Sequence, residues 1–299
     1  MIKRNIKFQY FYLVRQKAVG NKWKGLGKLD IAVWMDKVDK HQIKNTTIDL
    51  GDAKANIDKI ECDDDGNMWS FRFMKLREDN IPSIVRENQE AEAIKLDSDE
   101  YIGEGLHMLY DNETGIAMLQ VNRFSLGLNR LEALFSTIWN EENERIRLIS
   151  ILDKKIFDAW PRRCYRKIEI GFANITSQLE EGKNSLGTIM NLYRKFQGVS
   201  GNITISLGKT RRGTLNIDEV KEVVSDAMKD SAVGTLKLHV KDDDDRPVEV
   251  IDLFDEVAKD IIKFTLPEKT ALEYSYAILE MKNCYKARKE YLKGLINLK

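Results

Sequence analysis

The chain has 299 residues, 42% of them hydrophobic, and its 48 Lys and Arg residues balance its 48 Asp and Glu residues. This length allows one large core or two modest ones, and two domains are the better expectation. A dedicated nucleic-acid protein is usually basic overall, so the neutral total argues mildly against one, but a local basic patch would suffice. Only four prolines and no low-complexity tract argue against a long disordered linker.

No targeting or membrane segment is visible. The longest apolar run falls far short of the ~20 residues that a membrane-spanning helix needs, and the chain begins with a basic segment that leads into a strand. Three scattered cysteines, Cys62, Cys164 and Cys284, form neither a disulfide framework nor a metal-binding spacing. We therefore expect a cytoplasmic protein without a metal or other cofactor.

The first half of the chain predicts an antiparallel sheet with helices. Aromatic and β-branched residues predict a strand over 6–14, and a short helix fits 29–38. A turn at 111–114 predicts a hairpin, and a helix with a leucine-rich face follows. The predicted strands here are 46–50, 53–61, 68–76, 92–96, 105–110 and 115–121, and the helix is 126–139.

A highly charged stretch over 141–147 is the best candidate boundary, so we expect an N-terminal α+β domain over 1–143 and a C-terminal one over 144–299. The second half predicts strands over 148–152, 164–173, 202–207, 234–240 and 248–251, and helices over 153–160, 185–196, 216–229, 253–264 and 270–295. The fold class is therefore α+β, with two mixed layers: an antiparallel sheet with a helix, then a sheet with an antiparallel helix pair.

The last helix carries apolar residues at alternating spacings of four and three: Tyr274, Ile278, Met281, Tyr285, Leu292 and Leu295. Such a seam predicts pairing with another helix. The partner is either the predicted helix 253–264 or a second copy of the chain, and packing within the chain is the preferred interpretation.

Three basic clusters are candidate phosphate-binding sites. A Gly-rich loop at 20–27 places an aromatic residue between two lysines, and a turn between Gly208 and Gly213 holds cations where the backbone can approach a ligand. Arginine can also donate two hydrogen bonds to one phosphate. A solvated surface loop is the competing interpretation of each cluster. The candidate residues are Lys22, Trp23, Lys24, Arg162, Arg163, Arg166, Lys167, Lys209, Arg211 and Arg212.

No catalytic signature is visible. The three histidines, His41, His107 and His239, are far apart in sequence and lie near no recognisable nucleophile. Gly208-Lys209-Thr210 lacks the upstream spacing of a phosphate-binding loop. A metal-dependent nuclease would need converging carboxylates and a lysine. Carboxylates could come from Asp97, Asp99, Glu100 and Glu104. No lysine stands at a suitable spacing from them. We therefore expect no catalytic residues and no enzyme.

The C-terminal half resembles the RexA-like phage-exclusion proteins of the lambda Rex system. The resemblance lies in the order of a strand at 203–207, a basic run at 209–212, a helix at 217–228, a strand at 235–240, a charged hairpin, and a last helix with Ala277, Cys284 and Tyr285. The chain is also similar to KwaB of the Kiwa defence system and to an uncharacterised bacterial family. The resemblance implies a non-enzymatic homodimer that grips duplex DNA and signals to a membrane-protein partner.

Three hypotheses follow. The preferred one is a DNA-binding protein of an anti-phage exclusion or abortive-infection system, which contacts phosphates without strong sequence preference. The second is a protein-interaction adaptor in phage defence whose C-terminal helices form the partner surface. The third is a metal-dependent nuclease that uses the carboxylates near residue 100.

Overall fold

The structure is a computed structural model, and it describes residues 1–20, 22–153, 163–173, 186, 188, 193, 195, 196, 200–208, 210, 212–229, 233–241, 248–253 and 257–296, with residues 22 and 173 described through their backbone only. The chain divides into two compact units. Unit 1 contains residues 1–8, 29–146 and 260–287, and unit 2 contains residues 9–28, 147–259 and 288–299. One division, between residues 146 and 147, lies close to the expected boundary. A second follows β2, between residues 28 and 29, and the other three fall inside β1, β15 and α6.

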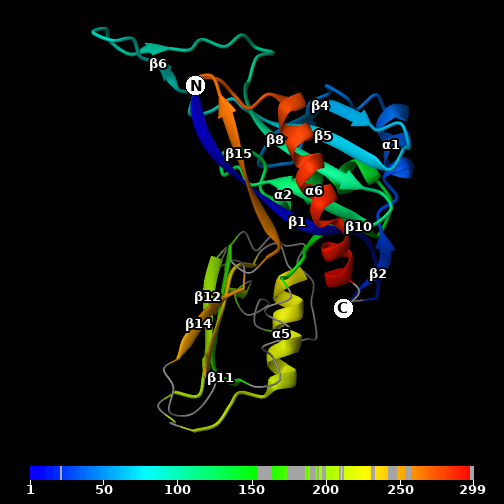
Figure 1. Cartoon of the computed structure of the whole chain (residues 1–299), viewed down its shortest axis with the longest axis vertical. Coiled ribbons are helices and arrows are strands. Elements are labelled where there is room, and N and C mark those ends of the chain that lie inside the picture. Colours follow the sequence, from blue (N-terminus) through cyan, green and yellow to red (C-terminus); the bar gives the residue numbers. More distant parts are fainter. Residues whose placement is uncertain are drawn as a thin grey trace. The chain divides into compact units, whose positions relative to one another are not determined.

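The fold is α+β, as expected (Figure 1). The largest sheet has the strand order β10-β1-β9-β8-β5-β4-β3, and β2 and β15 both pair with β1. Its strands are β1 (Ile2–Val19), β2 (Lys22–Lys28), β3 (Ile48–Asp49), β4 (Lys54–Cys62), β5 (Met68–Arg77), β8 (Ile102–Asp111), β9 (Ile116–Gln120), β10 (Glu144–Ser150) and β15 (Lys259–Leu266).

Within unit 1, helices cover both faces of the central strands. The alternation along β5 sends Phe71 and Phe73 to one face, where they contact the rings of Trp34 in helix α1 (Ile31–Lys40) and Phe135 in helix α2 (Leu128–Trp139). Ser70 lies on the other face and accepts a hydrogen bond from Tyr274 of helix α6 (Tyr274–Ile296). Because successive side chains of β5 point to opposite faces, the strand contacts α1 and α2 on one face and α6 on the other.

Unit 1 also carries a long arm between β5 and β8. The two strands pair with each other along their whole length, yet 24 residues, 78–101, connect them. Two short paired strands, β6 (Ser83–Ile84) and β7 (Glu92–Ala93), lie within this connection. Figure 1 shows the arm projecting from the sheet of unit 1.

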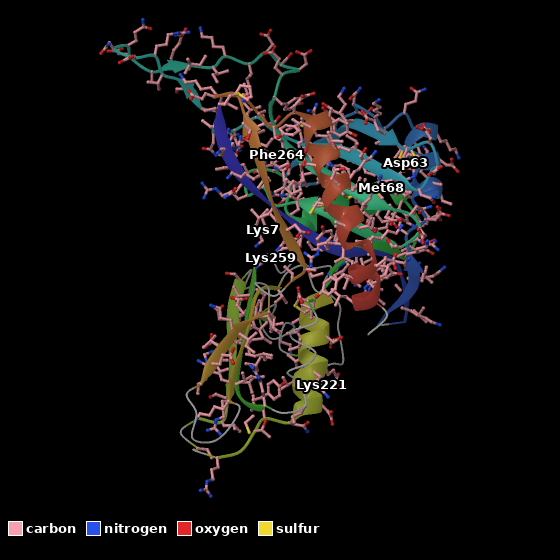
Figure 2. All side chains as sticks on the ribbon, viewed as in Figure 1. Lys7, Asp63, Met68, Lys221, Lys259 and Phe264 are labelled. Atoms are coloured by element: carbon pink, nitrogen blue, oxygen red, sulfur yellow. The ribbon has the colours of Figure 1, made fainter. Side chains whose placement is uncertain are left out.

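Unit 2 contains a four-stranded sheet of order β12-β11-β13-β14, and helix α5 (Ile217–Lys229) packs on it. The helix buries Val220, Val223, Val224 and Ala227, which confirms the apolar face predicted from the spacing. Lys221 lies on the exposed side of the same helix (Figure 2). The strands are β11 (Cys164–Ala173), β12 (Ser200–Ser206), β13 (Val233–Lys241) and β14 (Glu249–Asp252).

The predicted helix over 253–264 is wrong, and with it the antiparallel helix pair. Residues 259–266 form strand β15, in which Ile262, Phe264 and Leu266 are buried while Ile261 is exposed. In the sequence, charged residues in 255–260 separate pairs of apolar residues at a spacing that fits a helix. Residues 259–266 nevertheless pair with β1 as a strand, which buries every second side chain. The residues of the predicted seam of α6 are all buried within this chain, and Tyr274 and Tyr285 contact the sheet of unit 1.

The predicted helix over 153–160 and the acidic turn at 242–245 lie almost wholly outside the described residues. Of the predicted helix over 185–196, the described residues Leu186, Thr188, Tyr193 and Lys195 are helical. Among the described residues, no helix is both long enough and apolar enough to cross a membrane.

Candidate nucleic-acid interface

The first basic cluster is a β-hairpin. Strand β2 pairs antiparallel with the end of β1, from Val14 opposite Lys28 to Val19 opposite Lys22. The expected Gly-rich loop over 20–27 is therefore wrong for all but its first residues, because β1 supplies hydrogen-bonding partners for the backbone of 22–28. Gly20 has φ +60 at the turn, a conformation that favours glycine.

Positive charge gathers on this hairpin. Lys17 lies directly opposite Lys24, and both side chains are exposed. Residues 1–28 contain eight Lys and Arg residues and no Asp or Glu. Like charges directly opposite each other destabilise an antiparallel pair, so an anion that neutralises both lysines would stabilise the hairpin. Trp23 is half-buried opposite Ala18, and strand alternation places both on the face opposite to Lys17 and Lys24.

The second basic cluster lies at the start of β11, where a β-bulge changes the predicted faces. Tyr165 pairs with Val240 and Lys167 pairs with His239, so one extra residue of β11, Arg166, is inserted between them. The bulge puts Tyr165 into the core beneath α5 and Lys167 on the opposite face. Regular alternation along a strand would put Tyr165 and Lys167 on one face, and the bulge separates them because it breaks that alternation.

The cations of β11 are engaged within unit 2. Arg163 donates to Glu249 at 2.8 Å, and Lys167 forms an ion pair with Glu169. The neighbouring lysine keeps the pKa of Glu169 below its ordinary value. His239 Nε2 lies 3.3 Å from the Glu169 carboxylate. This sheet face therefore presents paired charges rather than a field of one sign.

The third cluster is only partly described. Arg166 donates to the backbone oxygens of Thr210 and Gly213, which ties the loop after β12 to β11. Arg212 is exposed in that loop. Lys209, Arg211, Arg162 and the side chain of Lys22 lie outside the described residues.

The carboxylates considered for a nuclease do not form a described metal site. Asp97, Asp99 and Glu100 are exposed on the arm, and Glu104 lies 4.0 Å from Arg77 in an ion pair. Nowhere in the described part of the chain do three or more His, Cys, Asp or Glu side chains gather as metal ligands.

The tertiary structure reveals a buried polar cluster in unit 1 that the sequence patterns did not predict. His107 is 3% exposed, and its Nδ1 lies 2.7 Å from Gln120 Oε1 while its Nε2 has no hydrogen-bond partner among the described residues. Burial lowers the pKa of His107. Beside it, Arg72 forms a bidentate pair with Asp58, and the Arg72 guanidinium lies over the Tyr274 ring.

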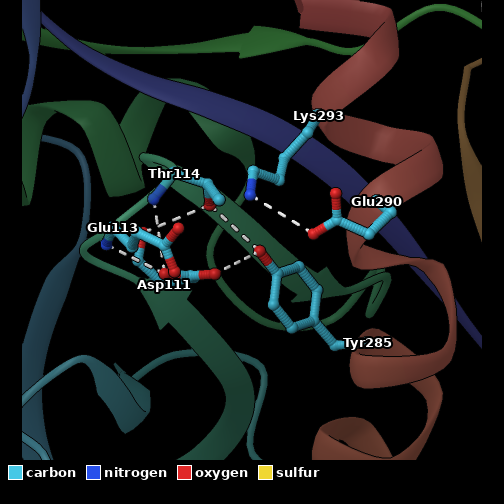
Figure 3. Close-up of polar contacts among 6 residues, drawn as sticks. All are labelled: Asp111, Glu113, Thr114, Tyr285, Glu290 and Lys293. Atoms are coloured by element: carbon cyan, nitrogen blue, oxygen red, sulfur yellow. Dashed lines mark hydrogen bonds and ion pairs between the residues drawn. The ribbon is translucent and has the colours of Figure 1, made fainter.

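A second buried cluster fixes α6 to the β8–β9 turn of unit 1 (Figure 3). The Tyr285 hydroxyl donates to Asp111 at 2.7 Å and lies 3.0 Å from the Thr114 hydroxyl. Asp111 also accepts hydrogen bonds from the backbone N–H groups of Glu113 and Thr114. Burial raises the pKa of Tyr285 well above its ordinary value, so the hydroxyl stays a donor. The contacts are those of a structural anchor.

Residues 1–293 match a protein family described as a family of unknown function, DUF6731. The chain belongs to the DUF6731 family. The match spans both compact units, so the hairpin, the arm and the small sheet all lie within the family region. No curated protein and no solved structure matches the chain.

Proposed function

We propose that this DUF6731 protein is a non-enzymatic DNA-binding protein that holds duplex DNA through phosphate contacts in the cytoplasm. The observation that carries the proposal is the β1–β2 hairpin, where Lys17 and Lys24 face each other in a stretch of 28 residues without a carboxylate. Lysines opposite each other concentrate positive charge on one face of the hairpin. A phosphate backbone is attracted to such a surface.

The proposal places the hairpin before β11, because segment 1–28 holds cations and no carboxylate, whereas β11 carries Glu169 beside its own cations. Arg163 and Lys167 already have carboxylate partners, and phosphate would have to displace Glu249 and Glu169 to reach them. Arg166 is occupied by backbone oxygens. The hairpin is therefore the principal contact in the proposal, with Arg212 and its neighbours in the loop after β12 as a second contact.

Contacts of this kind position a protein on DNA and carry no base readout. The protein would therefore recognise the shape and charge of the duplex. The resemblance to phage-exclusion proteins suggests the biological setting, an anti-phage system in which a homodimer reports to a membrane-protein partner. That setting is part of the proposal and does not follow from the hairpin itself.

The test is the salt dependence of binding to a random-sequence duplex, followed by fluorescence anisotropy. Log affinity should fall linearly with log salt, by about 0.9 for each phosphate contact. The double variant Lys17→Gln, Lys24→Gln should bind more weakly and lower this slope by roughly 1.8, because two contacts are lost.

The matched control is Lys167→Gln, Lys237→Gln, which removes the same net charge from positions that are paired with Glu169 and Asp252. This control should change the slope much less. Absence of duplex binding by the native chain at low salt, or equal slopes for the two double variants, would refute the proposal.

A further inference from the structure

The arm between β5 and β8 presents a largely exposed surface. No residue from 78 to 100 is buried, and all but three of these residues are exposed. The arm nevertheless has structure of its own, because β6 pairs with β7 and Arg86 forms an ion pair with Glu92 across the hairpin. A folded arm with so much exposed surface is suited to contact another molecule.

The arm carries a strong excess of negative charge. Residues 78–100 contain eight Asp and Glu residues against two Lys and Arg residues. The bend of the hairpin also exposes two adjacent apolar side chains, Ile84 at 45% and Val85 at 72%. The surface therefore combines an apolar centre with acidic flanks, an arrangement that an interface can use.

The complementary surface is present in the same sequence. The segment 1–28 holds eight cations and no carboxylate, and its β1–β2 hairpin exposes Val19 at 59% and Leu26 at 38% beside Lys17 and Lys24. In the register of the hairpin, the Lys17–Lys24 pair lies between Val19 and Leu26, so this surface has a positive centre with an exposed apolar side chain on either side. Opposite potentials steer association and fix the register of an interface, while the apolar side chains contribute burial.

We propose that the acidic arm of one copy of this chain docks on the basic β1–β2 hairpin of a second copy. The carboxylates of the arm would lie against Lys17 and Lys24, and Ile84 and Val85 would lie against one of the apolar side chains beside them, Val19 or Leu26. A reciprocal exchange buries two such contacts and closes the assembly as a two-fold dimer. The inference does not rest on DNA binding, since it uses the charge of the hairpin toward another protein surface.

Charge reversal tests the proposal, with mass measured by analytical ultracentrifugation at low salt. The native chain should form dimers. An arm variant, Glu87→Lys with Glu90→Lys, and a hairpin variant, Lys17→Glu with Lys24→Glu, should each associate at least ~100-fold more weakly, because each now opposes like charges.

The decisive step is mixing the two variants. The reversed arm of one variant can dock on the reversed hairpin of the other, and the native arm and hairpin remain for the reciprocal contact, so the mixture should regain dimers that neither variant forms alone. A control that reverses paired charges elsewhere, Lys237→Glu with Asp252→Lys, should dimerise like the native chain.

Other results would overturn the inference. A native chain that stays monomeric at all concentrations would show that the arm has a different occupant or docks on its own chain. Dimers that survive both reversals would place the interface elsewhere. Duplex binding by the arm variant is measured separately, so a failure of self-association and a failure of DNA binding are told apart.

Discussion

Tyr285 donates its hydroxyl hydrogen to Asp111, and this 2.7 Å bond joins α6 to the β8–β9 turn inside the core of unit 1. Both side chains are about 1% exposed. A buried carboxylate is costly unless it is hydrogen-bonded, and Asp111 meets that need with this hydroxyl and with backbone N–H groups of its own turn. The pair explains why an acidic residue is tolerated beneath a helix.

The first prediction concerns this bond. Tyr285→Phe should lower the free energy of unfolding by about 1–3 kcal/mol, because Asp111 loses a buried donor. Urea unfolding followed by circular dichroism measures the change. Tyr291→Phe is the matched control: its hydroxyl donates to Asp153 from the same helix, but its side chain is 41% exposed. The control should lie within about 0.5 kcal/mol of the native chain, and equal losses in the two variants would contradict the anchor.

The second prediction concerns the pH dependence of stability. Burial lowers the pKa of His107 in the folded chain below its ordinary value. The folded state then disfavours the protonated ring, so the stabilisation is present above the ordinary pKa of ~6.5 and is lost as pH falls below it. Protonation would also add charge near Arg72.

His107→Gln removes the titrating group, and its unfolding free energy should therefore fall less steeply than that of the native chain between pH 6.5 and 4.5. His41→Gln, at an exposed position, is the control for replacing a histidine by glutamine. Parallel curves for the native chain and the His107 variant would show that this ring does not titrate on unfolding in that range.

The third prediction concerns the packing of Tyr193 on β12. A Cβ atom at Gly201 would come within 2.2 Å of the Tyr193 ring, which also packs edge-on against Phe172. Gly201→Ala should therefore destabilise unit 2 by about 1–3 kcal/mol through overpacking. Gly25→Ala is a matched strand substitution with nothing within 4 Å of the added Cβ.

Thermal unfolding measures both glycine variants. The Gly25 variant should stay close to the native midpoint. Adding Tyr193→Ala to Gly201→Ala should cost less than the sum of the two single changes, because the clash disappears with the ring. Additive losses would mean that the two residues do not meet.

Local patterns in the sequence were sufficient for most elements. Strand β11 has the predicted bounds, and the predicted face of α5 is the buried one, because alternation and 3.6-residue spacing directly record which side meets a core. Within α6, the predicted apolar seam is also buried. In each case, the spacing of apolar residues along the segment indicates which side chains are buried.

Elements that depend on distant partners were not predictable in this way. Residues 259–266 carry a short alternation that also fits a helix, and pairing with β1 made them a strand. Residues 22–28 contain three lysines and two glycines, yet the end of β1 provides the hydrogen bonds that order them. At Tyr165, one inserted residue exchanged the two faces of β11. For the connection 78–101, no pattern in the sequence predicted that it would project from the sheet as an arm.

The amino-acid sequence by itself determined the α+β class, the positions of the amphipathic elements and the segregation of cations before residue 29, since each depends on composition or on nearest neighbours along the chain. Only the tertiary structure decided which charges lie beside each other. Arg163 lies beside Glu249 and Lys167 beside Glu169, and Lys17 is opposite Lys24 in the β1–β2 register. The reason is that charge pairing depends on contacts between strands, and strand register is set by the fold as a whole.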